Sequence, residues 1–288
     1  MDKSILIVGA GGQVGHELAI AAVPHHLIPL TRSDLDIEIP EAIEKVFDAH
    51  NPDIVINAAA YTAVDKAEHE SDAAFAINRD GVGNLARACK QAGIPLLHIS
   101  SDYVFDGEKS GAWYEDDPIS PQSAYGLSKA AGEAMLRDNL DQHIILRTSW
   151  VFSATGSNFV KTMLRLGKER DELGIVDDQH GCPTSAASIA GVLLQIVHRY
   201  LEGREVPWGT YHYCNQPETT WFDFAGAIFE AAGGYEKLKL KPIKTSDYLT
   251  PAARPKNSVL DCGKLESTFA VKPAKWLDEL RTVLDQIE

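Results

Sequence analysis

Residues 4–15 read SILIVGAGGQVG, and this stretch decides the fold. The apolar run Ser4–Val8 has no polar alternation, which is typical of a parallel strand buried on both faces. It leads directly into a turn with glycines at Gly9, Gly12 and Gly15. Glycines permit a tight turn and a close approach to a pyrophosphate, which then meets the positive end of the next helix. The stretch predicts a dinucleotide-binding βαβ unit, although a simple Gly-rich turn has the same pattern.

The alternation of helix and strand continues downstream. Helical composition alternates with short apolar runs, and such alternation predicts a Rossmann-like, doubly wound parallel sheet of the α/β class. The expected helices are His16–Val23, Glu41–Ala49, Ser71–Ala92 and Tyr125–Leu140. The expected strands after the first are Leu27–Leu30, Ile54–Ile56, Pro95–Ile99 and His143–Arg147.

Beyond Trp150 the alternation weakens. Helical segments are expected at Asn158–Leu166, Ala187–Tyr200 and Trp221–Ala232, separated by stretches that contain Pro and Gly. We therefore expect residues 1–150 to form a dinucleotide-binding domain. Residues 151–288 should form mainly a smaller, substrate-binding lobe, with some later segments returning to the sheet.

Composition excludes several classes of protein. The 288 residues allow one large domain or two, and 27 Lys and Arg against 41 Asp and Glu give a net charge of −14. An acidic chain without a Lys/Arg run is not expected to bind nucleic acid or an anionic membrane. The four cysteines lie far apart without a metal-binding spacing, so we expect them to be reduced. The start lacks the pattern of a signal peptide, and no apolar run is long enough to span a bilayer, so we expect a cytoplasmic protein.

The second strand ends at the position that distinguishes the two nicotinamide dinucleotides. An acidic residue there would hold the ribose hydroxyl of NAD, whereas a cation accommodates the 2′-phosphate of NADP. Arg32 favours NADPH, although an exposed loop arginine explains it equally well, and NADH is an alternative. Asp36, a few residues later, is expected near the adenine.

Tyr125 and Lys129 form a YxxxK pair on one face of a predicted helix. A tyrosine is a poor acid–base group at neutral pH, and a neighbouring ammonium favours its phenolate, which gives Lys129 a chemical task. Ser101 follows the fourth predicted strand, where the carboxyl ends of a parallel sheet form the ligand crevice. This combination favours catalysis over accidental spacing.

The glycine turn, Ser101 and the YxxxK pair together resemble the extended short-chain dehydrogenase/reductase superfamily. Longer strings resemble one family within it, the dTDP-4-dehydrorhamnose reductases, and they run in order over about residues 3–265. These strings are Asn57–Glu68, Ser101–Phe105, Arg147–Phe152, Pro251–Pro255 and Asn257-Ser258. The resemblance implies NAD(P)H reduction of the 4-keto group of dTDP-4-dehydro-L-rhamnose, the last step of dTDP-L-rhamnose synthesis.

The resemblance also implies roles for individual residues. Tyr125 would donate a proton to the sugar oxygen, Lys129 would lower the tyrosine pKa and hold the nicotinamide ribose, and Ser101 would hydrogen-bond the carbonyl. The cofactor would contact Gly9, Gly12, Gln13, Val14, Gly15, Arg32, Asp36, Ile37, Ala60, Tyr61 and Thr62, besides Tyr125 and Lys129. The substrate would contact Val64, Asp102, Tyr103, Trp150 and Arg254, besides Ser101 and Tyr125. Trp150 could equally be a core residue, and Arg254 a surface cation.

One departure from the family concerns metal. Some members bridge a homodimer through a divalent metal held by glutamates. Glu17 occupies the first position, but Ala187 replaces the second, and the chain reaches Glu288 without an evident third. We therefore expect no metal and no Mg²⁺ requirement, and a monomer or a weak homodimer.

Two alternatives stay open at this stage. The first is a regulatory subunit that binds NADP without catalysis, like the β-subunit of methionine adenosyltransferase, which resembles this family. The second is a reductase of a related 4-keto-6-deoxy nucleotide sugar. Turnover of a sugar nucleotide, against binding to a partner enzyme, separates the first alternative from the reductase.

Overall fold

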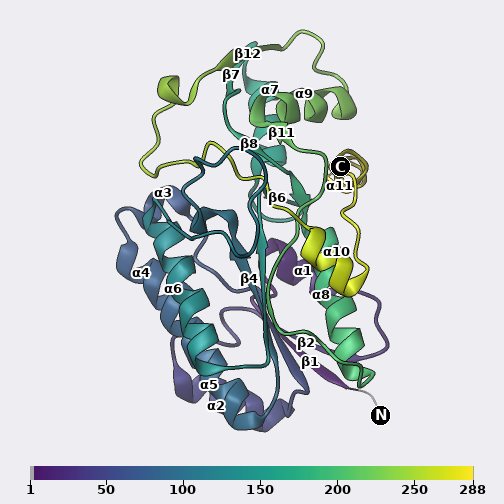
Figure 1. Ribbon diagram of the computed structural model, residues 1–288. Coiled ribbons are helices and arrows are strands. Elements are labelled where there is room, and N and C mark those ends of the chain that lie inside the picture. Colours follow the sequence, from purple (N-terminus) through teal and green to yellow (C-terminus); the bar gives the residue numbers. More distant parts are fainter. Residues whose placement is uncertain (1–2, 288) are drawn as a thin grey trace.

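A computed structural model describes residues 3–287, and its centre is a sheet of six parallel strands (Figure 1). Across the sheet the order is β10, β5, β4, β3, β1, β2. The bounds are β1 (Ser4–Val8), β2 (His26–Leu30), β3 (Ile54–Asn57), β4 (Leu96–Ser101), β5 (His143–Thr148) and β10 (Gly209–His212). The chain moves outward from β1 in both directions, so the order reverses between β1 and β3, where such sheets bind ligands. The predicted Rossmann-like sheet is confirmed.

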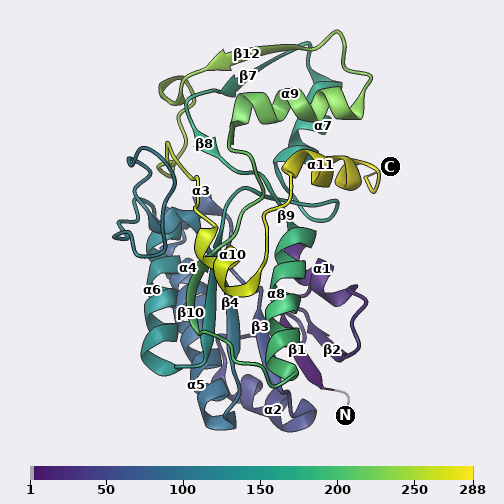
Figure 2. The same ribbon diagram turned by 45° about the vertical axis from the view of Figure 1, so that its right-hand side comes forward.

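Helices cover both faces of the sheet, which explains its apolar strands. Ile5, Leu6 and Ile7 are completely buried, as are all four residues of β3. One face carries α1 (Gln13–Ala19), α8 (Ala186–Leu201) and α10 (Gly263–Phe269), and the other α2 (Pro40–His50), α5 (Val82–Ala92) and α6 (Ala124–Asn139) (Figure 2). A strand buried on both faces needs no polar alternation.

The chain returns to the sheet after residue 185. Helix α8 packs on α1, and β10 adds a sixth strand that runs parallel to β5, with Tyr211 beside Leu146. Residues 186–212 thus belong to the layers of the sheet although they lie beyond residue 150. In residues 3–287, no helix is both long and apolar enough to cross a membrane.

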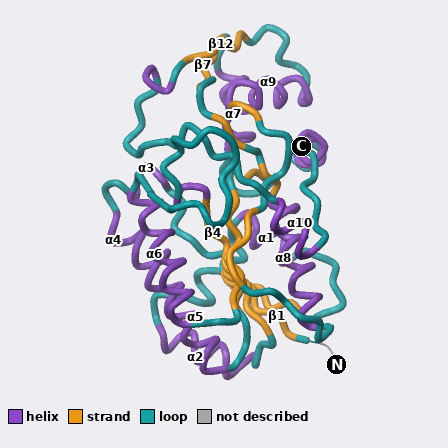
Figure 3. The backbone as a smooth tube through the Cα atoms, in the orientation of Figure 1, coloured by secondary structure: helices purple, strands orange, loops and turns teal. Residues whose placement is uncertain are grey.

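A smaller lobe lies over the carboxyl ends of the strands. It contains the parallel pair β7 (Glu172–Val176) and β12 (Lys239–Ile243). Its helices are α7 (Phe159–Glu169), α9 (Trp221–Ala232) and α11 (Trp276–Leu284), which bury Met163, Phe224 and Leu280 between them. Two short pairs, β6 (Val151–Phe152) with β9 (Thr184–Ser185) and β8 (His180–Gly181) with β11 (Thr219–Thr220), connect it to the sheet. Loops gather at this junction (Figure 3).

Two of the predicted helices were placed incorrectly. The first helix begins at Gln13 rather than His16, because Gly12 is its N-cap, and it ends at Ala19 rather than Val23. Residues 71–92 are not one α-helix: α4 (Ser71–Phe75) and α5 are separated by a π-helical segment, Ala76–Gly81. Its Asn78 amide bonds both backbone groups of Tyr61 and the Ser128 hydroxyl, and these contacts accompany the wider turn.

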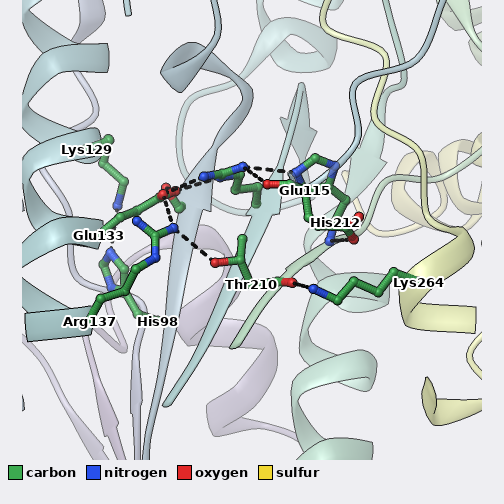
Figure 4. Close-up of polar contacts among 10 residues, drawn as sticks. His98, Glu115, Lys129, Glu133, Arg137, Thr210, His212 and Lys264 are labelled. Carbon is green, nitrogen blue, oxygen red and sulfur yellow. Dashed lines mark hydrogen bonds and ion pairs between the residues drawn. The ribbon is translucent and has the colours of Figure 1, made fainter. Parts of the chain in front are cut away.

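A buried ion pair joins α6 to the sheet. The Arg147 guanidinium on β5 donates two hydrogen bonds to the Glu133 carboxylate on α6, at 2.8 and 2.7 Å. Arg137 donates to the same carboxylate (Figure 4). The Ser100 hydroxyl also donates to it, and Arg147 faces His212 at 3.4 Å. Burial alone raises the pKa of Glu133, but the hydrogen bonds and charge of Arg147 outweigh it and hold that pKa below its ordinary value. Both oxygens of the buried Glu133 carboxylate therefore accept two hydrogen bonds each.

Glu133→Gln should destabilise the protein by about 3–5 kcal/mol at pH 7, because it leaves Arg147 buried without its counter-charge. The pKa of Glu133 is lower in the folded chain, so its contribution is complete above about pH 4.3 and declines as the pH falls through the folded-state value. Urea unfolding of both proteins from pH 7 to pH 3 measures this difference. A constant difference across that range would show that the carboxylate charge is not the cause.

Candidate active site

The glycine turn has space for a ligand on one side and none on the other. Gly9 has φ +86°, and a Cβ there would lie 2.5 Å from the Ala59 nitrogen. A Cβ on Gly15 would lie 2.0 Å from the Gly9 carbonyl oxygen, so this glycine brings α1 against the turn. At Gly12 the same test gives 3.4 Å, and at Gly11 the space is open. The open side is where the backbone can approach a phosphate.

A cavity of about 190 Å³ extends from this turn to the end of β2. Its lining contains six of the predicted cofactor residues: Gly9, Gly12, Arg32, Asp36, Ile37 and Ala60. Arg32 is exposed and pairs with Glu38 at 3.1 Å. Asp36 Oδ1 accepts the backbone N–H of Glu38. A cation and a carboxylate therefore both lie at the adenosine end of the cavity.

The other predicted cofactor residues lie around this cavity without lining it. Gln13 Oε1 accepts hydrogen bonds from Ser153 and Asn158, both at 2.9 Å, and so ties the glycine turn to the smaller lobe. The Val14 side chain is part of the core. The Tyr61 hydroxyl donates to Glu70, which raises the pKa of Tyr61 to about 12. Thr62 is exposed beside it.

Helix α6 carries Tyr125 and Lys129 to the carboxyl end of β4. The helix begins after Ser123, whose hydroxyl accepts the Gly126 N–H at 3.1 Å. Tyr125 is buried and packs edge-on against Tyr103, with ring centroids 5.4 Å apart. Ser101 is the last residue of β4. Two of these three predicted catalytic residues, Tyr125 and Ser101, lie near each other: the Ser101 hydroxyl lowers the pKa of Tyr125, although burial raises that pKa more.

The expected effect of Lys129 on Tyr125 is absent from this structure. The Lys129 ammonium donates to the Ile99 carbonyl at 2.7 Å and faces His98 Nε2 at 3.3 Å. Burial lowers the pKa of Lys129 to about 8 and raises that of Tyr125 above its ordinary value. A lowered tyrosine pKa was expected from the YxxxK pair and from the family resemblance, but burial of both side chains outweighs their proximity along the helix.

Asp102 is a buried carboxylate next to Ser101. Its Oδ1 accepts the Ser101 hydroxyl at 2.9 Å, while Oδ2 has no hydrogen-bond partner of good geometry among residues 3–287. Burial raises the pKa of Asp102 to about 6, and the nearby hydroxyls of Ser258 and Ser101 oppose that rise. An acceptor without a partner at this place can bind a hydroxyl group of a ligand.

A second cavity, of about 490 Å³, lies between the sheet and the smaller lobe. It is lined by three predicted substrate residues, Tyr103, Trp150 and Arg254. The lining also contains residues that sequence reasoning missed: Asp65, Phe159, Thr162, Met163, Arg170, Gln179, Trp221 and Tyr248. Most lie on the smaller lobe, whose position over the sheet no local pattern reveals. Val64 begins α3 (Val64–Ala67) and packs near Tyr125.

Trp150 has an unusual backbone and a close aromatic neighbour. Its φ is +49°, which a bulky residue rarely adopts, and its indole stacks on Trp221 with centroids 3.5 Å apart. Gly181 lies beneath the ring, where a Cβ would be 2.4 Å from the indole. Strain of this kind is kept where surrounding contacts determine it, commonly at ligand sites. Trp150 is therefore held as a flat wall of the second cavity.

Arg254 is only half engaged by the protein. One terminal nitrogen donates to Asp65 at 2.8 Å. The other, Nη1, is buried without a hydrogen bond of good geometry in the described chain, although the Tyr103 hydroxyl lies close to the guanidinium and Arg254 lines the second cavity. A guanidinium with an unused buried donor is suited to an anionic group such as a phosphate.

Among residues 3–287 no group of His, Cys, Asp or Glu side chains could hold a metal ion. Glu17 lies on α1 and Ala187 in the first turn of α8. Glu288 lies outside the described residues.

Comparison with known proteins gives a consistent result over the whole chain. The family model "RmlD substrate binding domain" matches residues 3–288. A dTDP-4-dehydrorhamnose reductase of Aggregatibacter actinomycetemcomitans is 45% identical over 286 residues, which is 97% of each chain. A crystal structure of the reductase ortholog from Clostridium acetobutylicum has a TM-score of 0.92 and 40% identity and covers 98% of both chains. The Bacillus anthracis enzyme, solved in complex with NADP, has a TM-score of 0.93 and 36% identity and covers 99% of this chain and 100% of that one.

Gly12→Ala should weaken NADPH binding about tenfold or more with little change in melting temperature, because its Cβ fits the protein and enters only the space left for the ligand. Gly15→Ala should also lower the melting temperature, since its Cβ meets backbone at 2.0 Å. Gly191→Ala on α8, where the space is open, is the matched control: it should leave NADPH affinity unchanged, and it should raise the melting temperature slightly if it changes it at all, because alanine favours a helix interior over glycine. Calorimetric titration and thermal unfolding measure both effects. Wild-type affinity in Gly12→Ala would rule out this turn as the pyrophosphate site.

Asp102→Asn should stabilise the protein by about 2–3 kcal/mol at pH 7.5. The pKa of Asp102 is raised to about 6 in the folded chain, so ionisation costs stability as the pH rises from about 4 through 6. The gain should therefore vanish near pH 4. Urea unfolding at both pH values measures it, with the exposed Asp48→Asn as control. Equal stability of wild type and Asp102→Asn at pH 7.5 would contradict the assignment.

Proposed function

The chain belongs to the dTDP-4-dehydrorhamnose reductase family, and from this premise we propose that it reduces the 4-keto group of dTDP-4-dehydro-L-rhamnose with NADPH. The product is dTDP-L-rhamnose, and the reaction is the last step of its synthesis. NADH is the alternative reductant.

The observation that carries this proposal is the place of Tyr125 and Ser101 between two cavities. Ser101 ends β4, and the neighbouring strand β3 leads into Ala58–Ala60, which line the cavity of the glycine turn. Tyr125 packs on Tyr103, which lines the larger cavity. A dinucleotide in the first cavity and a sugar nucleotide in the second would thus meet at these two hydroxyls.

The reduction needs a hydride at C4 and a proton at its oxygen. When bound in the first cavity, NADPH would supply the hydride. Burial keeps the Tyr125 phenol protonated at neutral pH, so it carries the proton that the carbonyl oxygen takes as its negative charge develops. The Ser101 hydroxyl can turn from Asp102 to the same oxygen and stabilise that charge. A buried phenol is a weak acid, so its proton moves only when the hydride has made the oxygen basic.

Binding is assigned to the residues around each cavity. Gly9, Gly12, Gln13, Val14 and Gly15 would surround the pyrophosphate, Ala60, Tyr61 and Thr62 the middle of the dinucleotide, and Lys129 its nicotinamide ribose. Arg32 is suited to a 2′-phosphate, and Asp36 with Ile37 to the adenosine. In the second cavity Val64, Asp102, Tyr103 and Trp150 would contact the sugar, and Arg254 Nη1 a phosphate.

Assembly and location are further parts of the proposal. We infer a monomer or a weak homodimer without a bridging metal, because Ala187 stands where some family members have a glutamate ligand. A cytoplasmic location is supported by the four cysteines, which are all free and buried.

Tyr125→Phe should lower kcat at least about 100-fold, because it removes only the proton donor. NADPH affinity and melting temperature should stay close to wild type. The assay follows NADPH absorbance with dTDP-4-dehydro-L-rhamnose made in situ by the preceding pathway enzymes. Tyr200→Phe, on α8 far from both cavities, is the matched control and should retain full activity.

Two outcomes would contradict the proposal. Unchanged turnover in Tyr125→Phe would show that another group supplies the proton. Tight NADPH binding by the wild type without oxidation would instead favour a regulatory subunit, or a reductase of a related 4-keto-6-deoxy sugar nucleotide.

A further inference from the structure

A chain of three buried polar side chains crosses the sheet beneath the site. Asn57 on β3, His98 on β4 and Lys129 on α6 are all at most 1% exposed. Asn57 Nδ2 lies 3.1 Å from His98 Nδ1, and His98 Nε2 lies 3.3 Å from Lys129 Nζ. Neither His98 nor Asn57 takes part in the proposed reaction, and buried polar side chains are stable where each donor has an acceptor.

A hydrogen bond from the backbone fixes the orientation of the Asn57 side-chain amide. Its Oδ1 accepts the Ala59 N–H at 3.0 Å, so the Nδ2 group must face His98. A flipped amide would set Nδ2 against the Ala59 N–H, donor against donor. Asn57 therefore donates to His98 Nδ1, which must carry a lone pair.

This donation determines the tautomer of His98. A neutral imidazole with a lone pair on Nδ1 carries its proton on Nε2. Burial lowers the pKa of His98 far below its ordinary value, and the nearby Lys129 and His143 lower it further, so the ring is neutral. Its Nε2–H consequently points at Lys129 Nζ, and it forms a hydrogen bond there only if the amine offers a lone pair. An ammonium has three donors and no acceptor.

We propose that His98 is a positioning residue for Lys129: the Asn57 amide fixes the tautomer whose Nε2–H faces Lys129 Nζ, so that His98 offers no acceptor to the ammonium and donates a hydrogen bond only to the uncharged amine, while the Ile99 carbonyl accepts from either form. The inference deepens the proposed function, because it concerns a lysine placed in that site. The Nε2–H of His98 favours the uncharged form of Lys129, so Lys129 can release and regain a proton near neutral pH. A lysine that exchanges protons with its surroundings in each turnover needs this property.

Other charged groups around His98 and Lys129 do not reverse the lowering of the Lys129 pKa. Glu133, one turn along α6, raises the pKa of Lys129, but its carboxylate is engaged by Arg147 and Arg137. Figure 4 shows His98 and Lys129 beside that cluster. His143 on β5 is the other titratable group facing His98, and its ring contacts the Leu140 carbonyl. Burial of Lys129 is the larger effect and acts in the same direction as the His98 hydrogen bond.

The test is NMR of the full-length protein labelled with ¹⁵N in histidine and lysine side chains, first without NADPH. We expect His98 to show the Nε2–H tautomer from pH 6 to pH 9, and Lys129 to titrate near the value of about 8. In His98→Gln the amide oxygen can accept from an ammonium, so the acid dissociation constant of Lys129 should fall about tenfold or more. Asn57→Ala should leave His98 in a mixture of tautomers and change Lys129 in the same direction.

His143→Gln is the matched control, a second buried histidine replaced in the same way, and it should leave the His98 tautomer and the Lys129 titration unchanged. The Nδ1–H tautomer in the wild type, or an unchanged Lys129 titration in His98→Gln, would overturn the inference. Neither readout needs the sugar substrate. An Nε2–H tautomer in a protein that does not oxidise NADPH would count against the proposed function alone, and the Nδ1–H tautomer in an active reductase against this inference alone.

Discussion

The buried pair of Arg147 and Glu133 is the interaction on which the rest of this structure depends. It joins β5, the strand beside the edge strand β10, to α6, the helix that carries Tyr125 and Lys129. Taking two charges out of water is costly, and here the cost is offset because Ser100 and Arg137 occupy the remaining acceptor positions of the carboxylate. A bidentate contact also sets an angle and not only a distance. The pair therefore fixes the orientation of α6 on the sheet, and with it the position of the first turns of α6, which carry Tyr125 and Lys129.

Close approach of backbones supplies the second constraint. A Cβ on Gly132 would lie 1.9 Å from the Asn78 carbonyl oxygen, so α6 reaches the π-helical segment only because it has a glycine there. Gly15 plays the same part between α1 and the glycine turn. With α6 held on both sides, Tyr125 and Lys129 are buried too deeply for their ordinary pKa values. The packing that positions the two groups therefore also raises the pKa of Tyr125 and lowers the pKa of Lys129.

The two lobes are connected by contacts that also shape the cavities. Gln13 on the glycine turn accepts hydrogen bonds from Ser153 and Asn158, and Arg254 from late in the chain pairs with Asp65 after β3. The strained Trp150 lies between β5 and β6 and stacks its ring on Trp221 of the smaller lobe. A ligand that spans both cavities would therefore contact residues whose positions depend on one another.

The sequence by itself determined five of the six strands of the sheet, the glycine turn and the family, because these depend on local periodicity and on short motifs with fixed spacing; it did not reveal β10. It placed Ser101 and Tyr125 correctly relative to the sheet, since the carboxyl ends of parallel strands meet at one edge. Only the tertiary structure decided the environment of each group: that Lys129 contacts Ile99 and His98, that one oxygen of the buried Asp102 has no hydrogen bond of good geometry to residues 3–287, and that Trp221 and Arg170 line the second cavity. Burial and distant contacts set the pKa of a side chain and the walls of a cavity, and neither is encoded in the residues next to it along the chain.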